Sequence, residues 1–218
     1  MSKMLYRIIK RIFDIIFSLF LLILLSPLLL VISLLIWFSD RGEIFLKDPL
    51  RLGLDGKYFR MYKFRSMIPD AHKEILNNPK FAELKKKWEN PGIKLTIDED
   101  TRITKIGRII RKTDLDELPQ LINVLKGDMS LIGPRPMYRE EIETYLKSNP
   151  KDKKYLKYIL TVRPGMTGVW QVSGRNLISF KNRLVIDAKY SQNMNIWDDS
   201  KIFFKTPYIV LTRKGAYG

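Results

Sequence analysis

The longest apolar stretch of the chain runs from Ile15 to Ser39 and contains no charged residue. About 20 apolar residues in a helix suffice to cross the hydrocarbon core of a bilayer, so the pattern predicts a membrane helix. No small-residue cleavage site follows it, which argues against a signal peptide. Ser26-Pro27 lies in the middle. Because proline removes a backbone N–H and clashes with the preceding turn, we expect the helix to kink or break there, with the Ser26 hydroxyl bonding back to a freed carbonyl.

Both ends of this stretch are basic. The flanking cations are Lys3, Arg7, Lys10 and Arg11 before it, and Arg41, Lys47 and Arg51 after it. Positive flanks favour the cytoplasmic side of a membrane at both ends. A re-entrant helix, which enters and leaves by the same face, satisfies both observations and is favoured. A kinked helix that spans the bilayer is the alternative. Asp14 is expected to pair with Lys10 or Arg11, one turn back.

The rest of the chain predicts a small β-hairpin and several helices. Alternating residues at 43–51 and 57–65 flank Gly53-Leu54-Asp55-Gly56, whose Asp-Gly favours a tight turn. In the second run, Lys63 and Arg65 fall on one face. The expected helices cover residues 69–90 with a break at Asn78-Pro79, 102–112, 118–126, 138–146, 155–160, 179–191 and 197–213.

These elements predict an α+β fold that is mostly α. We expect a membrane part at residues 1–40 and a cytoplasmic catalytic domain at 41–218, with a helical insertion at about 68–100. In the helix at 102–112, Ile103, Ile106 and Ile110 share one face and basic residues cover the rest. Such an amphipathic helix can lie at an anionic membrane interface.

The composition narrows the chemistry. The formal net charge is +16 over 218 residues, which favours a polyanionic partner such as a phosphate-rich substrate, anionic lipid or nucleic acid; a basic surface kept for solubility is the alternative. The chain has no cysteine and a single histidine, His72. These counts exclude thiolate-bound metals and make histidine triads implausible. An enzyme of this composition would depend on carboxylates, arginines and a carboxylate-bound metal.

The densest cluster of charged residues is 111–120, which contains Asp116 and Glu117. Pro119 fits only the first turn of a helix, so the two acids lie at or just before a helix N-terminus, with Thr113 or Asp116 as the expected cap. The positive helix end should lower the carboxylate pKa and keep both groups ionised. An ionised aspartate is a competent nucleophile and a hard ligand for Mg²⁺. On spacing alone, however, simple capping of the helix is the favoured interpretation.

Two further motifs present arginines. In Gly133-Pro134-Arg135-Pro136, the prolines fix the backbone around Arg135, whose guanidinium matches phosphate bidentately. Arg163 and Arg175 stand in two glycine-rich runs, residues 163–168 and 170–176, which permit tight turns and close approach to a ligand. A surface ion pair is the plain alternative for each arginine.

Taken in order, these motifs resemble a known family. The matching runs are Lys10-Arg11-Ile12-Phe13-Asp14, Ser26-Pro27, Tyr62-Lys63-Phe64-Arg65-Ser66-Met67, Leu115 to Leu121, Asn123 to Ser130, Gly133-Pro134-Arg135-Pro136, Arg163 to Gly168 and Gly174-Arg175-Asn176. Nearly end to end, the chain resembles the bacterial sugar transferases that are monotopic phosphoglycosyl transferases, which start O-antigen, capsule, exopolysaccharide and glycoprotein glycan assembly. The resemblance reverses the preference for simple capping at residues 116 and 117.

The resemblance implies a reaction and a set of roles. Asp116 would attack the sugar-linked phosphorus of a UDP-sugar, release UMP and form a covalent phospho-sugar enzyme, which polyprenyl phosphate (undecaprenyl phosphate) would then attack. Mg²⁺ would bind at Asp116 and Glu117, and Glu117 would hold the metal or assist proton transfer. The phosphate- or nucleotide-binding set would comprise Lys63, Arg111, Arg135, Arg163 and Arg175.

The resemblance also bears on substrate and location. The insertion at about 68–100 is similar to that of the hexose-1-phosphate transferases, so glucose or galactose is the first expectation for the sugar. The expected partners are a UDP-sugar, polyprenyl phosphate and membrane lipids, with a homodimer left open. The expected location is the cytoplasmic face of the bacterial inner membrane, with a re-entrant helix broken at Ser26-Pro27.

Two other classes of function remain as alternatives. A membrane-anchored nucleic-acid-binding protein would fit the charge, but the basic residues are spread among motifs and no binding module is recognised, so we expect no nucleic-acid partner. A non-catalytic membrane scaffold would tolerate Asp116→Asn. The enzyme hypothesis would be contradicted by an Asp116 buried in packing, or remote from the bilayer surface and from guanidinium groups.

Overall fold

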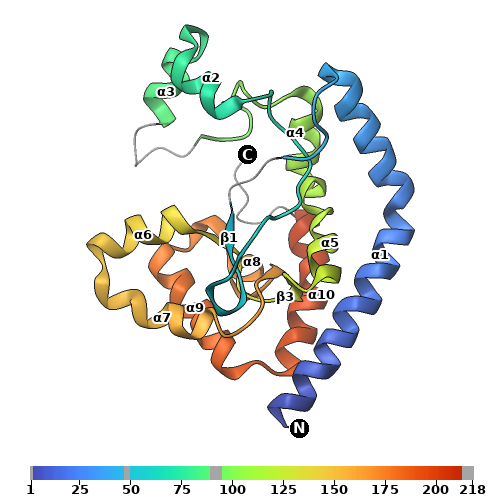
Figure 1. Ribbon diagram of the computed structural model, residues 1–218, viewed down its shortest axis with the longest axis vertical. Coiled ribbons are helices and arrows are strands. Elements are labelled where there is room, and N and C mark those ends of the chain that lie inside the picture. The colour runs from blue at the N-terminus through green and yellow to red at the C-terminus, as the bar shows by residue number, and fades with distance from the viewer. Residues whose placement is uncertain (1, 47–49, 89–94, 213–218) are drawn as a thin grey trace. The chain divides into compact units, whose positions relative to one another are not determined.

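The computed structural model describes residues 2–46, 50–88 and 95–212 (Figure 1). Within these residues the chain forms two compact units. The first contains residues 2–26, 50–62 and 119–212, and the second contains residues 27–46, 63–88 and 95–118. Both are predominantly helical, and the first also contains short strands, which confirms the predicted α+β, mostly α class.

Helix α1 (Lys3–Asp40) is the predicted membrane helix. By length and composition it is the one described helix that could cross a bilayer. The helix continues through Ser26 and Pro27, and the Ser26 hydroxyl donates to the Ile23 carbonyl at 2.8 Å. Pro27 therefore lies inside a continuous helix, so the expected break at Ser26-Pro27 was wrong, and the Ser26 hydroxyl partly replaces the lost backbone bond. A re-entrant path stays a prediction, as does a boundary between a membrane part and a catalytic domain at residue 40. The two units divide α1 at Ser26.

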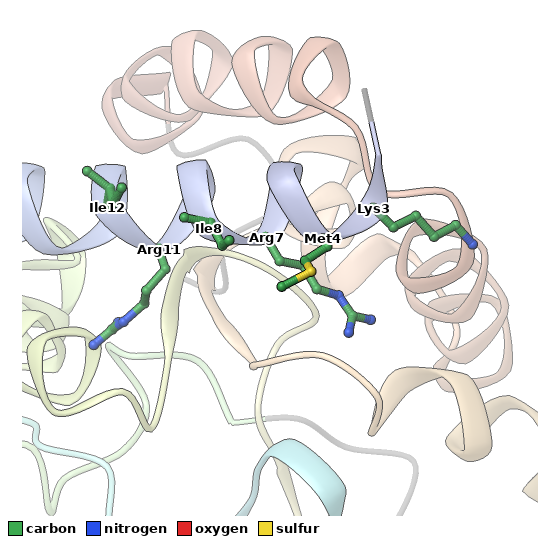
Figure 2. Close-up of a pocket in the computed structure, with 6 residues that line it drawn as sticks. All are labelled: Lys3, Met4, Arg7, Ile8, Arg11 and Ile12. Carbon is green, nitrogen blue, oxygen red and sulfur yellow. The ribbon is translucent and has the colours of Figure 1, made fainter.

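The first turns of α1 carry a basic stripe beside an apolar one. Figure 2 shows Lys3, Arg7 and Arg11 at four-residue intervals next to Met4, Ile8 and Ile12. Arg11 donates to the carbonyls of Val124 and Leu125, at 2.6 and 3.0 Å. These carbonyls belong to the last turn of α5 (Gln120–Lys126), where a cation is favourable.

Two acids, Asp14 and Asp199, connect the first half of α1 with the rest of the first unit. Asp14 accepts a hydrogen bond from the Leu131 backbone N–H at 3.0 Å, and the charges of the expected partners, Lys10 and Arg11, act on its carboxyl. Lys10 pairs with Asp199 at 2.6 Å. The exposed apolar residues of α1, among them Ile16, Ile23 and Leu30, indicate an association with membranes.

The first unit contains both small sheets and most of the helices. Antiparallel β2 (Tyr58–Phe59), β1 (Arg51–Leu52) and β4 (Met137–Tyr138) form one sheet, and parallel β3 (Ser130–Ile132) and β5 (Gly165–Thr167) form the other. The register pairs Arg51 with Phe59 and Tyr138, and Ser130 with Gly165. The remaining helices are α6 (Arg139–Ser148), α7 (Lys153–Ile159), α8 (Val169–Ser173), α9 (Phe180–Asn193) and α10 (Ile196–Thr212), with 3₁₀ turns at Leu54–Gly56, Pro150–Asp152 and Arg175–Leu177.

The predicted hairpin is present but shorter than expected. Its turn places Asp55 and Gly56 in the left-handed region, at φ 54° and 73°, as an Asp-Gly pair permits. Outside β1 and β2, the antiparallel pair of Phe45 with Phe64 lies in the second unit, which also pairs Met67 with Ile103. The expected long strands are thus divided between the two units.

Two apolar clusters form the core of the first unit. One contains Leu121, Val124 and Met129 with Phe17 of α1 and Phe203 of α10, whose rings lie 5.0 Å apart. The other joins α7 and α9 through Ile159 and Leu184 (Figure 1). Helix α10 contains Pro207 and buries Ile202 and Ile209, which confirms the expected helix.

The second unit contains α2 (Ala71–Asn77), α3 (Ala82–Trp88) and α4 (Lys105–Lys112), with 3₁₀ turns at Pro79–Phe81 and Leu115–Glu117. The break expected at Asn78-Pro79 is confirmed: Asn78 accepts a hydrogen bond from the Lys80 backbone N–H at 3.0 Å. Helix α4 begins at Lys105 because Thr104 caps it, accepting from the Gly107 N–H at 2.9 Å.

Candidate functional site

The Asp116-Glu117 pair lies in a single 3₁₀ turn, Leu115–Glu117, between α4 and α5. Asp114 precedes it in the left-handed region, at φ 55°, and Pro119 directly precedes α5. The prediction that both acids stand just before a helix is therefore confirmed. The expected caps were wrong, because Thr113 ends α4 and Asp116 caps neither the 3₁₀ turn nor α5.

The backbone of this acid dyad, Asp116 and Glu117, is fixed by the extended segment around Phe64. The Phe64 N–H donates to the Asp116 carbonyl oxygen at 2.9 Å. The Phe64 side chain is buried, and it packs with Ile110, Leu115 and Ile36. This core holds the chain on either side of the acids, so their position depends on apolar packing beneath them.

Lys63 bridges the two acids. Its ammonium lies 2.9 Å from a carboxylate oxygen of Asp116 and 3.3 Å from one of Glu117. The side chain of Asp116 is 3% exposed, against 19% for Glu117 and 18% for Lys63. The burial of Asp116 differs from the accessible acid that we expected. Burial of this acid in packing is the result that would contradict the enzyme hypothesis, and Asp116 is buried, although its carboxylate contacts the ammonium of Lys63.

Arg111 supplies a second positive charge near the dyad. Its Nε donates to the Ser66 hydroxyl at 2.7 Å, and its charge acts on the carboxyl of Asp116. Helix α4, which carries Arg111, approaches Ser66 closely at Gly107. The predicted set Lys63, Arg111, Asp116 and Glu117 is thus brought together in the second unit. Arg65, predicted to share a face with Lys63, instead binds the carbonyls of Glu43 and Met67.

The electrostatics of Asp116 differ from the expectation of a lowered pKa. Burial raises the pKa of the Asp116 carboxyl, the ammonium of Lys63 opposes this, and the charge of Glu117 raises the pKa further. The reason for the difference is that a three-residue turn offers little helix dipole, whereas loss of water at the acid is nearly complete. Lys63 is therefore the group that most favours the ionised form of Asp116.

A metal would find two carboxylates at this site. Within residues 2–46, 50–88 and 95–212, no group of three or more acid, histidine or cysteine side chains could hold a metal ion. Mg²⁺ commonly binds one or two carboxylates and completes its shell with water and phosphate oxygens. Asp116 and Glu117 fit that donor set once the ammonium of Lys63 leaves the space between them.

Arg135 stands in the first unit on a tightly constrained loop after β3. The Gly133 N–H donates to Thr167 O and the Gly165 N–H to Pro134 O, both at 2.8 Å. A Cβ on Gly165 would lie 2.1 Å from the backbone nitrogen of Gly133, so only glycine permits this crossing. The half-buried Arg135 side chain is thereby presented from a rigid backbone.

The other two predicted arginines lie in the same unit. The Nε of Arg163 donates to the Gly127 carbonyl at 2.8 Å, just after α5. Arg175 begins a 3₁₀ turn with φ 49° and follows Gly174, at φ 152°. A phosphate-binding role for either arginine stays a prediction.

Sequence reasoning missed two buried ionic residues of α9, Arg183 and Asp187, which are 7% and 1% exposed. A signal was present, since both fall on the buried face with Leu184 and Ala188. Charged residues at the apolar positions of a helix mark either a buried ion pair or a contact with a functional loop.

Comparison with known proteins agrees with the motifs. The model of the bacterial sugar transferase family matches residues 5–213. The chain is 44% identical to the undecaprenyl-phosphate galactose phosphotransferase of Salmonella typhimurium, over 100% of this chain and 43% of that protein. It is 38% identical to the exopolysaccharide production protein ExoY of Sinorhizobium fredii, over 95% of this chain and 88% of that protein.

A third relative is the UDP-glucose:undecaprenyl-phosphate glucose-1-phosphate transferase of Escherichia coli. The identity is 34%, over 97% of this chain and 42% of that protein. The chain therefore spans less than half the length of the Salmonella and Escherichia relatives. On the match to the family model and on these identities, the chain belongs to the bacterial sugar transferase family.

Proposed function

We propose that this protein transfers a sugar 1-phosphate from a UDP-sugar to polyprenyl phosphate at the cytoplasmic face of the bacterial inner membrane. The observation that carries the proposal is the Asp116-Glu117 pair, bridged by Lys63 beside Arg111. Two acids and two cations on a fixed backbone suit phosphoryl transfer, in which positioning and electrostatic stabilisation supply most of the catalysis. The names of the Salmonella and Escherichia relatives, which concern sugar-phosphate transfer to undecaprenyl phosphate, support the same reaction.

In the first step, a carboxylate oxygen of Asp116 attacks the sugar-linked phosphorus of the donor. The new bond joins that oxygen to phosphorus, the bond from phosphorus to the bridging oxygen breaks, and UMP leaves. In the second step, an oxygen of polyprenyl phosphate attacks the same phosphorus and the Asp116 carboxylate leaves. The product is a polyprenyl diphosphate sugar, and the enzyme returns to its initial state.

Burial of Asp116 assigns a particular task to Lys63. While its ammonium binds the acid, the acid is covered. A donor diphosphate offers Lys63 stronger acceptors than the carboxylate, so we propose that Lys63 moves to the donor and uncovers Asp116. This agrees with the predicted phosphate-binding role of Lys63. Arg111, held by Ser66, remains beside the dyad to stabilise charge at phosphorus.

Mg²⁺ bound by Asp116 and Glu117 would supply charge neutralisation for the donor diphosphate. Glu117, the more exposed of the two acids, can hold the metal or accept a proton from the acceptor. Arg135 and Arg175 of the first unit would bind phosphate or nucleotide. We propose glucose or galactose as the sugar, because of the helical insertion and because the names of two relatives specify galactose and glucose.

The exposed apolar surface of α1 and the basic stripe of Figure 2 suit a re-entrant anchor at an anionic bilayer surface. We propose this course over a full crossing, since both flanks of the apolar stretch are basic. The product would begin the assembly of an exopolysaccharide, capsule or O-antigen.

The test measures UMP release by the purified chain in detergent from a panel of UDP-sugars, with and without Mg²⁺ and undecaprenyl phosphate. We expect turnover of at least one hexose donor, dependent on Mg²⁺. Asp116→Asn should abolish it, and the exposed Asp98→Asn serves as a matched control that retains it. A membrane scaffold would show no release from any donor and no effect of Asp116→Asn on its function.

A further inference from the structure

Arg183 of α9 reaches the loop that carries Arg135. One of its terminal nitrogens donates to the Arg135 carbonyl oxygen at 3.0 Å. Its side chain is 8% exposed, so this bond is shielded from water. Both residues belong to the first unit. A charged donor on a buried carbonyl fixes the backbone of Arg135 more strongly than a neutral donor would.

Arg183 and Arg135 also share one aromatic ring. The Arg183 guanidinium carbon lies 4.9 Å from the centroid of Trp170, and that of Arg135 lies 5.8 Å from the same centroid. Trp170, on α8, is itself buried. A ring face attracts a guanidinium within about 6 Å. The indole therefore orients the side chain of Arg135 while Arg183 holds its backbone.

The counterion of Arg183 is only a loose one. Asp187, one turn along α9, approaches the Arg183 Nε no closer than 3.7 Å. Arg183 Nε, Asp187 Oδ2 and Trp170 Nε1 are buried, and within the described part of the chain they have no hydrogen-bond partner. Buried ions held so loosely destabilise a fold compared with apolar side chains. Packing alone does not explain why this helix carries them.

The charges near Arg135 leave an excess of positive charge. Arg183 and Arg135 act on one another, and Asp187 is the carboxylate nearest to Arg183, with Glu141 of α6 and Arg51 of β1 also acting on it. Three cations, Arg183, Arg135 and Arg51, against the two carboxylates of Asp187 and Glu141 leave a positive excess that favours an added anion. Arg135 is the half-buried arginine of this group, and Arg183 fixes its backbone.

We propose that Arg183 is a positioning residue for anion binding: together with Trp170 it holds Arg135 in the geometry that receives the donor's diphosphate. The inference rests on the proposed function, because it takes Arg135 as a ligand of the diphosphate. Arg183 itself does not touch the substrate. Its loss acts through Arg135 alone.

A double-mutant cycle tests this relation directly. UDP is the probe, and its dissociation constant is measured by isothermal titration with the full chain in detergent. Arg135→Ala and Arg183→Met are compared singly and together, with the exposed Lys189→Met of α9 as a matched loss of one charge. We expect each single variant to weaken UDP binding by about tenfold, the double variant to be no weaker than Arg135→Ala, and Lys189→Met to bind as the wild type does.

Because Arg183 is buried, the conservative variant Arg183→Lys is measured beside Arg183→Met. A thermal unfolding curve is recorded for every variant. Lysine keeps the charge but lacks the planar group that reaches both the carbonyl and the ring, so we expect intermediate affinity at an unchanged melting temperature. Additive losses in the cycle, or an Arg183→Lys of unaltered affinity, overturn the proposal, as does a wild type without affinity for UDP. Failure of the proposed function is a different result: UDP binds with the expected coupling, yet no UMP is released from any donor.

Discussion

Gly107 provides a test of how the site is built, because the usual effect of its replacement should be reversed. Alanine in place of glycine inside a helix normally stabilises it by about 0.5–1 kcal/mol. Here a Cβ on Gly107 would lie 1.8 Å from the Ser66 carbonyl oxygen and 2.6 Å from its carbonyl carbon. Both are backbone atoms, which cannot swing aside, so α4 must move away by more than an ångström.

The cost of Gly107→Ala can be estimated from the contacts that this movement breaks. Overpacking costs about 1–3 kcal/mol. The bonds from Thr104 N–H to Ser66 O, at 3.1 Å, and from Arg111 Nε to the Ser66 hydroxyl, at 2.7 Å, add about 0.5–1.5 kcal/mol each. Less the helix gain, the net destabilisation is about 1–5 kcal/mol. For a chain of this length it corresponds to a melting temperature lower by roughly 2–20 °C.

The assay is thermal unfolding in detergent, followed by near-ultraviolet circular dichroism, together with UMP release. Ile109→Ala, at an exposed position of the same helix, is the matched control and should change neither by much. Because Arg111 moves with α4, kcat/KM of Gly107→Ala should fall by up to about 100-fold. A raised melting temperature, or full activity, would refute the close approach of α4 to Ser66.

The remaining predictions concern Lys63, Asn123 and Asp187. Lys63→Met should move the acid limb of the pH–rate profile to higher pH, because the ammonium opposes the rise in the Asp116 pKa; an unmoved or lowered limb would disprove this role. Asn123→Ala should lower the free energy of unfolding, measured with denaturant, by about 3–5 kcal/mol. The fully buried amide accepts a hydrogen bond from the Tyr62 N–H and donates one to the Arg60 carbonyl, both at 2.8 Å. A loss below about 1 kcal/mol would contradict this structural role of Asn123. Burial raises the pKa of Asp187 to about 7, so between about pH 4 and pH 7 the native state keeps a proton that the unfolded state has lost. The free energy of unfolding should therefore fall as the pH rises through this range. Asp187→Asn should flatten this slope, and an equal slope in both proteins would argue against the raised pKa.

The position of the dyad could be predicted because it depends on local rules. Pro119 is confined to a first helical turn, which places Asp116 and Glu117 just before α5. Likewise Asn78-Pro79 predicts the break before α3, and Asp55-Gly56 predicts the hairpin turn. Each of these signals acts over a few residues and needs no knowledge of the tertiary structure.

The burial of Asp116 could not be predicted, because it depends on contacts distant in the sequence. Its environment is made by the segment around Phe64, which docks on the 3₁₀ turn through a backbone bond and a buried ring. The expected lowering of its pKa failed for this reason, since the helix-end argument ignored desolvation. Arg163 lies at Gly127 only because β3 and β5 pair, which no short pattern reveals.

The most direct test of the central claim is to look for sugar phosphate on Asp116. The full chain is incubated with a UDP-hexose that it turns over, without acceptor, and then analysed by intact-mass and peptide mass spectrometry. We predict one hexose phosphate per chain on the peptide that contains Asp116, lost when undecaprenyl phosphate is added and absent from Asp116→Asn. Product formation in a single kinetic step, with no sugar phosphate on the protein at any time, would contradict the account.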